Sequence, residues 1–221
     1  MQDELRALVQ DKAAKLPGPL AQAFKADMAS RRVTDRFGGV DDCDGSASFA
    51  EDKPSCLPAA GGQTRWDALG LPDLRTLKAS HAAEAPDLLK AGRDEAEAWS
   101  ILRSALSVSE GQSRIITTPT REVVIEDWAL RHIVEKREAM RERFSNFILP
   151  VLTMPLEVWR TQYEDGLYRE RYIKLFTGKH DMYVIVRIND DGSLLWNAVP
   201  SRVGTVQNQR AGELLWKGYG E

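Results

Sequence analysis

Apolar side chains recur at helical spacing in three stretches of the first half of the chain. Residues 1–15 and 20–30 predict two short helices, and residues 83–106 contain a longer amphipathic helix after Pro86. Residues 33–64 are rich in Gly, Ser, Asp and Pro and carry few large apolar side chains, which is typical of a flexible linker. The pattern predicts an N-terminal helical segment (1–32), a linker (33–64) and a second helical segment (65–110).

The second half of the chain has the pattern of a mixed domain. Residues 115–125 are β-branched and predict extended backbone, and residues 128–148 predict a helix. Four strand-like runs follow, at 168–176, 182–189, 193–199 and 212–218, and the Asp-Asp-Gly sequence at 190–192 indicates a tight turn. We therefore expect an α+β domain over residues 112–221, with helices packed on a four-stranded antiparallel sheet.

The stretch 128–148 separates its side chains by type when it is placed on one helix. The apolar side chains fall on one face, which we expect to pack on the sheet: Leu130, Ile133, Val134, Met140, Phe144, Phe147 and Ile148. His132, Lys136 and Arg143 form a column on another side of the same helix. This column is either a solvated face joined by ion pairs or a functional group, since histidine carries protons near neutral pH.

Charge restricts the classes of partner. The 221 residues carry a net charge of −3; residues 1–120 hold 15 basic and 18 acidic side chains, and residues 121–221 hold 15 of each. Neither half is the strongly basic body typical of nucleic-acid binders, so any such contact must come from a local patch. No apolar run approaches the roughly 18 residues that a spanning helix needs, and we expect no membrane contact.

Two cysteines, Cys43 and Cys56, lie in the linker sequence with no histidine near them. Two thiols do not complete a tetrahedral zinc site, so we expect reduced thiols in a loop, and their role stays open. The chain begins with a charged amphipathic stretch rather than a secretory signal, which favours a cytoplasmic location.

Several short motifs of the last hundred residues occur in an order that resembles a known group of domains. These motifs are His132 in the first helix, Arg141 and Arg143 after it, Pro155 with Glu157 and Trp159, Tyr172 with Lys174, and Arg210 with Gly212 and Leu214. Together they resemble the phage-type branch of the barnase–EndoU–colicin–RelE-like nuclease domains, over about residues 115–221. Such domains are found fused to head-morphogenesis proteins of Mu-like phages and to polyvalent proteins.

The resemblance implies a metal-independent ribonuclease, of toxin or effector type, that needs no cofactor. A base would remove the 2′-hydroxyl proton, cations would stabilise charge on the phosphate, and an acid would protonate the leaving oxygen. On this hypothesis His132 is the acid or base, Arg143 and Arg210 clamp the phosphate, and Asn197 donates to it. Lys136, Tyr172 and Lys174 would bind the substrate, and no residue would hold a metal.

Each of these residues also has a structural interpretation, and two functions stay open. The first is an endoribonuclease of a host cytoplasm or a virion, acting on RNA such as tRNA and controlled by an immunity protein. The second is a phage minor head, morphogenesis or adaptor protein whose inactive domain binds a phage structural protein. The sequence leaves open the RNA target, the oligomeric state and the role of residues 1–110. Convergence of His132, Arg143 and Arg210 in one cleft would favour the enzyme.

Overall fold

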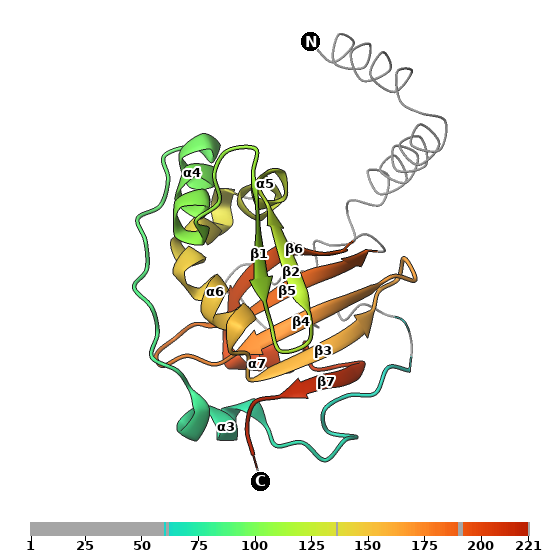
Figure 1. Ribbon diagram of the computed structural model, residues 1–221. Helices are drawn as coiled ribbons and strands as arrows, with labels where there is room; N and C mark the ends of the chain where they lie inside the picture. Colours follow the sequence, from blue (N-terminus) through green and yellow to red (C-terminus); the bar gives the residue numbers. More distant parts are fainter. Residues whose placement is uncertain (1–59, 61, 136, 190–191, 221) are drawn as a thin grey trace, which may run out of the picture. The chain divides into compact units, whose positions relative to one another are not determined.

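The computed structural model describes residues 60, 62–135, 137–189 and 192–220 (Figure 1). The helices expected at 1–15 and 20–30, both cysteines and nearly all of the expected linker lie outside the described residues. Within the described part of the chain, no helix has the length and apolar character that crossing a membrane requires.

The expected α+β domain is confirmed, but its sheet has seven strands rather than four. In spatial order the strands are β1-β2-β6-β5-β4-β3-β7. Their bounds are β1 Ser113–Thr117, β2 Glu122–Glu126, β3 Glu157–Gln162, β4 Tyr168–Lys174, β5 Asp181–Asn189, β6 Gly192–Ser201 and β7 Glu213–Lys217. The sheet is mixed rather than antiparallel, because β2 pairs with β6 in parallel.

Two features account for the three extra strands, and a third changes the order of the strands. The expected extended run at 115–125 is a hairpin, since a turn at residues 118–121 separates β1 from β2. The residues after Pro155 form a strand, β3, which pairs with β4. Strand β7 does not continue the meander beside β6, but pairs with β3 at the far edge. Only β4, β5 and β6 follow one another as the sequence predicts.

Helices cover both faces of this sheet, and each face has its own core. The helices are α3 Leu74–His81, α4 Glu95–Leu106, α5 Asp127–Val134, α6 Ser145–Thr153 and α7 Val203–Gln207. Helices α4, α5 and α6 share one core with Tyr172 and Val184, while side chains of α3 and α7 share the other with Trp159 and Tyr183. Figure 1 shows α4 and α6 together at one side of the sheet and α3 near β7.

The alternation of side chains along the strands defines two faces, which we call the α4–α6 face and the α3–α7 face. Segment 65–110 contributes to both cores, through Leu74 and Leu77 of α3 and through Ala98, Leu102 and Leu106 of α4. An isolated bridge between Arg65 and Ala211 joins the start of this segment to the residues just before β7.

The prediction of a single helix over 128–148 is wrong, because helix α5 ends at Val134. Two short 3₁₀ segments, η1 Arg137–Ala139 and η2 Arg141–Phe144, lie between α5 and α6. Met140 joins them in the left-handed region, with φ 44°. After the break, Glu142 is fully buried and accepts from the Gly92 N–H (3.1 Å) and from Arg137 (3.0 Å). These tertiary contacts outweigh the helical periodicity, which treats Glu142 as a surface residue.

Candidate functional site

A β-bulge in β6 places two consecutive side chains on the same face of the sheet. Ile185 pairs with Asn197 and Val186 pairs with Leu195, so Trp196 is the extra residue. Leu195 belongs to the core of the α4–α6 face, and Ile185 belongs to the core of the other. The bulge therefore presents both Trp196 and Asn197 on the α3–α7 face, where a regular strand would present only one.

Three arginines of the neighbouring strands share this face. Arg169 of β4 pairs directly with Arg187 of β5, and Arg171 lies two residues further along β4. The Arg187 guanidinium lies 3.1 Å from the centroid of the Trp196 ring. Arg171 is buried; it donates to the Tyr163 hydroxyl (3.1 Å) and to the Gln209 carbonyl (3.2 Å). The face therefore carries several buried or half-buried guanidinium groups side by side.

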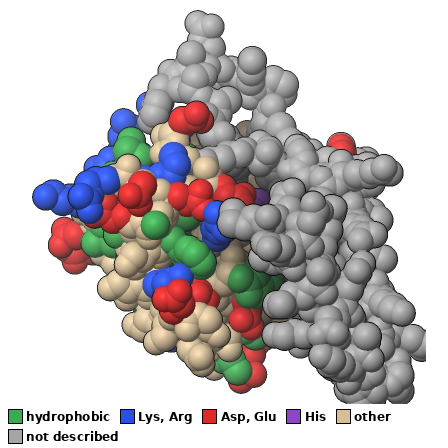
Figure 2. All heavy atoms as spheres, turned by 90° about the horizontal axis from the view of Figure 1, so that it is seen from above, with side chains coloured by type: hydrophobic (Ala, Val, Ile, Leu, Met, Phe, Trp, Pro, Cys, Tyr) green, Lys and Arg blue, Asp and Glu red, His purple; other side chains and the backbone are tan. Residues whose placement is uncertain are grey.

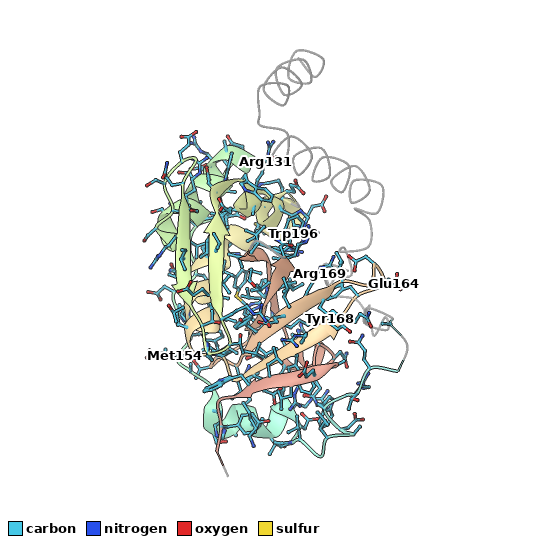
Figure 3. All side chains as sticks on the ribbon, turned by 45° about the vertical axis from the view of Figure 1, so that its right-hand side comes forward. Arg131, Met154, Glu164, Tyr168, Arg169 and Trp196 are labelled. Atoms are coloured by element: carbon cyan, nitrogen blue, oxygen red, sulfur yellow. The ribbon has the colours of Figure 1, made fainter. Side chains whose placement is uncertain are left out.

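His132 and Arg141 reach the bulge from outside the sheet. The His132 ring, at the end of α5, lies against Trp196 with a centroid separation of 4.5 Å and a tilt of 32°. Arg141, the first residue of η2, is buried and donates to the Asn197 side-chain oxygen at 2.8 Å. Figure 3 shows Trp196 at a level between Arg131 on α5 and Arg169 on β4. We call this group the His132 site: His132, Arg141, Arg187, Trp196 and Asn197.

The His132 site combines a proton carrier with hydrogen-bond donors. The His132 side chain is 27% exposed, whereas Arg141 and Asn197 are 5% and 3% exposed, so the imidazole is the accessible member. The Trp196 Nε1 atom is buried and has no hydrogen-bond partner among the described residues. A buried donor without an acceptor is costly, by about 1–3 kcal/mol, which makes this N–H a candidate contact for a bound ligand.

Arg143 and Arg210 are not brought to His132. Arg143 lies beside the segment before α4, where its Nε donates to the Leu89 carbonyl at 3.4 Å. Arg210 is 1% exposed and bound to Glu157 of β3, and strands β4 and β5 separate β3 from β6. The expected clamp of these two arginines around one phosphate is therefore not formed. Lys136 lies outside the described residues.

The ion pair of Arg210 with Glu157 is part of a hydrogen-bond network in the α3–α7 core. Arg210 donates to both carboxylate oxygens of Glu157, at 2.6 and 2.7 Å, and to the Pro72 carbonyl at 2.9 Å. The Tyr219 hydroxyl donates to the same carboxylate at 2.5 Å. Burial, together with the adjacent Glu157 carboxylate, raises the pKa of Tyr219. The charged and polar groups of this network bond to one another inside the core, so we interpret the network as structural.

Tyr172 and Lys174 lie on the α4–α6 face, opposite the bulge. The Tyr172 hydroxyl is buried and contacts the hydroxyls of Thr118 and Thr120 and the Glu170 carboxylate, at 3.0, 2.6 and 2.9 Å. Burial first, and then the charge of Glu170, raise the pKa of Tyr172 to about 12. The Lys174 ammonium donates to the Met154 carbonyl, and burial lowers the pKa of Lys174. Neither side chain is placed to meet a substrate held at His132.

The cluster around Tyr172 continues to the surface of the α4–α6 face as an open groove of about 340 Å³. The groove is lined by Arg121, Arg160, Tyr168, Ile188 and Glu213. Its charges neutralise one another: Arg121 lies 2.6 Å from the buried Glu170 carboxylate, and Arg160 lies 3.0 Å from Glu213. The Arg121–Glu170 pair fastens the β1–β2 hairpin to β4, and the lining of the groove contains no histidine.

Sequence reasoning missed three members of the site for identifiable reasons. Arg141 and Arg143 both belong to the motifs of the resemblance. The backbone break at Met140 decides which of these two arginines reaches the bulge. Arg187 fits the pattern of an outward-facing strand residue, and Trp196 that of a cross-strand partner. Only the bulge places the Trp196 side chain on the same face of the sheet as Asn197, and no glycine marks the bulge in the sequence.

The face of the molecule seen in Figure 2 does not present a uniform basic field. In Figure 2, which views the molecule from above, Lys and Arg side chains gather at one margin, with Asp and Glu side chains beside them. Among the described residues, no group of three His, Cys, Asp or Glu side chains is placed to hold a metal ion.

Comparisons with known proteins agree with this architecture. Residues 102–217 match the family model of the phage barnase–EndoU–colicin E5/D–RelE-like nuclease 2, which is more than half of the 221 residues. Searches of curated proteins and of solved structures each gave no match. The matched region begins within α4, ends at the last residue of β7 and contains every strand of the sheet. The chain therefore belongs to the phage barnase–EndoU–colicin E5/D–RelE-like nuclease 2 family.

Proposed function

We propose that the chain is a metal-independent endoribonuclease that cuts RNA at the His132 site. The observation that carries the proposal is the convergence of His132 with Arg141, Trp196 and Asn197 from α5, η2 and β6. A histidine beside guanidinium groups can supply the base and the charge stabilisation that cleavage by an internal 2′-hydroxyl needs. Family membership supports nuclease chemistry, and these groups support RNA as the substrate.

The reaction can be written with the groups of this site. The His132 imidazole takes the proton of the 2′-hydroxyl, whose oxygen forms a bond to the adjacent phosphorus. Arg141 and Arg187 stabilise the negative charge on the phosphate oxygens through N–H donors. The bond from phosphorus to the 5′-oxygen breaks, that oxygen takes up a proton from solvent water, and the His132 imidazolium releases its proton to the solvent. The products are a 2′,3′-cyclic phosphate and a 5′-hydroxyl end.

The first test measures cleavage of total RNA and of tRNA by the full chain in EDTA. We expect His132→Ala to lower the rate by about 10²–10⁴-fold, the range for loss of a general acid or base. Arg141→Gln should lower the rate by about 10²–10³-fold through loss of charge stabilisation. Arg143→Gln is the matched control, since this arginine lies two residues away but contacts Leu89 instead, and it should cut like the parent.

Circular dichroism and thermal unfolding of each variant separate lost chemistry from lost folding. Arg141 is buried, so Arg187→Gln serves as a second charge variant if Arg141→Gln unfolds. A folded His132→Ala protein that cuts RNA as fast as the parent would place the chemistry elsewhere. Absence of cleavage by the folded parent would reject the enzyme and favour a domain that only binds a phage structural partner.

A further inference from the structure

Glu135 lies directly beside the imidazole of His132. Its Oε2 atom is 3.2 Å from His132 Nδ1, and the Glu135 side chain is 55% exposed. Helix α5 ends at Val134, but Glu135 still has helical backbone angles, with φ −53° and ψ −40°. Its side chain therefore reaches back across one helical turn to the residue three positions earlier.

The ring of His132 is held by a second contact. It lies against Trp196 at a tilt of 32°, and this contact limits rotation of the imidazole about its own side-chain bond. A carboxylate only accepts hydrogen bonds, so the nitrogen facing Glu135 must carry a hydrogen for the 3.2 Å contact to be a hydrogen bond. The other nitrogen, Nε2, then has the lone pair.

We propose that Glu135 is a positioning residue that holds His132 in the Nδ1–H tautomer and leaves Nε2 to face the substrate. The proposal rests on the proposed function for its consequence in catalysis, but the tautomer itself is a property of the free protein. In this arrangement neutral His132 accepts the 2′-hydroxyl proton at Nε2, and the resulting imidazolium is stabilised by the Glu135 carboxylate. Glu135 itself touches no reacting atom.

The test uses nitrogen NMR of the full chain with isotope-labelled histidine. His132→Gln identifies the His132 signals among those of the three histidines. We expect the neutral parent protein to show hydrogen on Nδ1, and Glu135→Ala to show hydrogen moving to Nε2. Glu138→Ala is the matched control, an exposed carboxylate on η1 three residues away, and it should leave the tautomer unchanged. Hydrogen on Nε2 in the parent, or an unchanged tautomer in Glu135→Ala, would overturn the proposal.

Kinetics on RNA separate this inference from the proposed function. We expect Glu135→Ala to lower kcat about tenfold at constant KM, well short of the roughly 10⁴-fold for a buried triad carboxylate, because Glu135 is half exposed. If His132→Ala abolishes cleavage while Glu135→Ala cuts like the parent, the function stands and the positioning role fails. If the tautomer depends on Glu135 but no RNA is cut, the pair exists and the enzyme proposal fails.

Discussion

Arg210 and Arg141 are both buried arginines, but their partners give them different tasks. Arg210 holds a carboxylate through two hydrogen bonds, so its charge is neutralised inside the α3–α7 core. Arg141 donates to the Asn197 amide oxygen and lies in the same site as the partly exposed His132 ring. The Arg210 pair therefore stabilises the fold, whereas Arg141 belongs to the site where we propose that RNA is cut.

The pair of Arg210 and Glu157 gives a prediction about stability. Glu157→Gln removes the charge that compensates a fully buried guanidinium, and we expect it to lower the free energy of unfolding by about 3–5 kcal/mol. Urea-induced unfolding followed by circular dichroism measures the loss. Arg93→Gln is the control, because the Arg93 side chain is 87% exposed and only pairs with Glu97 at the surface, and the unfolding midpoint should change little. Equal midpoints for the parent and Glu157→Gln would show that the network does not stabilise the fold.

At the scale of the element, the sequence predicts those features that local pattern controls. Helix α4, strands β4, β5 and β6, and the core positions Phe144, Phe147 and Ile148 follow the periodicity of apolar residues. The break between α5 and α6 does not, because Glu142 is buried there by contacts with nearby Arg137 and with Gly92, which is far away in the sequence. The same limit applies to the candidate site: the sequence proposes His132 and Asn197, but the bulge and the break decide which residues lie beside them.

The break itself can be tested at Met140, which has φ 44° and is 41% exposed. The left-handed region costs an L-residue roughly 1–2 kcal/mol and is most unfavourable for β-branched side chains. We expect Met140→Val to destabilise the protein by about 1–2 kcal/mol and Met140→Gly to retain or increase the stability of the parent. Thermal unfolding of the three proteins gives the comparison. A valine variant as stable as the glycine variant would mean that the break takes another conformation in solution.

At the scale of the whole molecule, the order of the strands is the feature that no local pattern contains. The hairpin of β1 and β2 joins the edge of β6 through a parallel pair, Val124 with Leu194. At the other edge, β7 pairs with β3. Both of these strand pairs, β2 with β6 and β3 with β7, join residues that are more than fifty positions apart, whereas β4, β5 and β6 are joined by short turns.

These two kinds of pairing have a kinetic consequence. Closing a short loop costs less chain entropy than closing a long one, so the β4–β5–β6 meander can form before β2 pairs with β6 or β7 pairs with β3. We expect Val184→Ala in β5 to slow refolding, and Val123→Ala in β2 to accelerate unfolding with little effect on refolding. Stopped-flow refolding and unfolding in urea measure both rates. The opposite partition would mean that the hairpin nucleates the fold. On the expected order, the bulge that carries Trp196 and Asn197 is built early, and His132 is docked onto it in a later step.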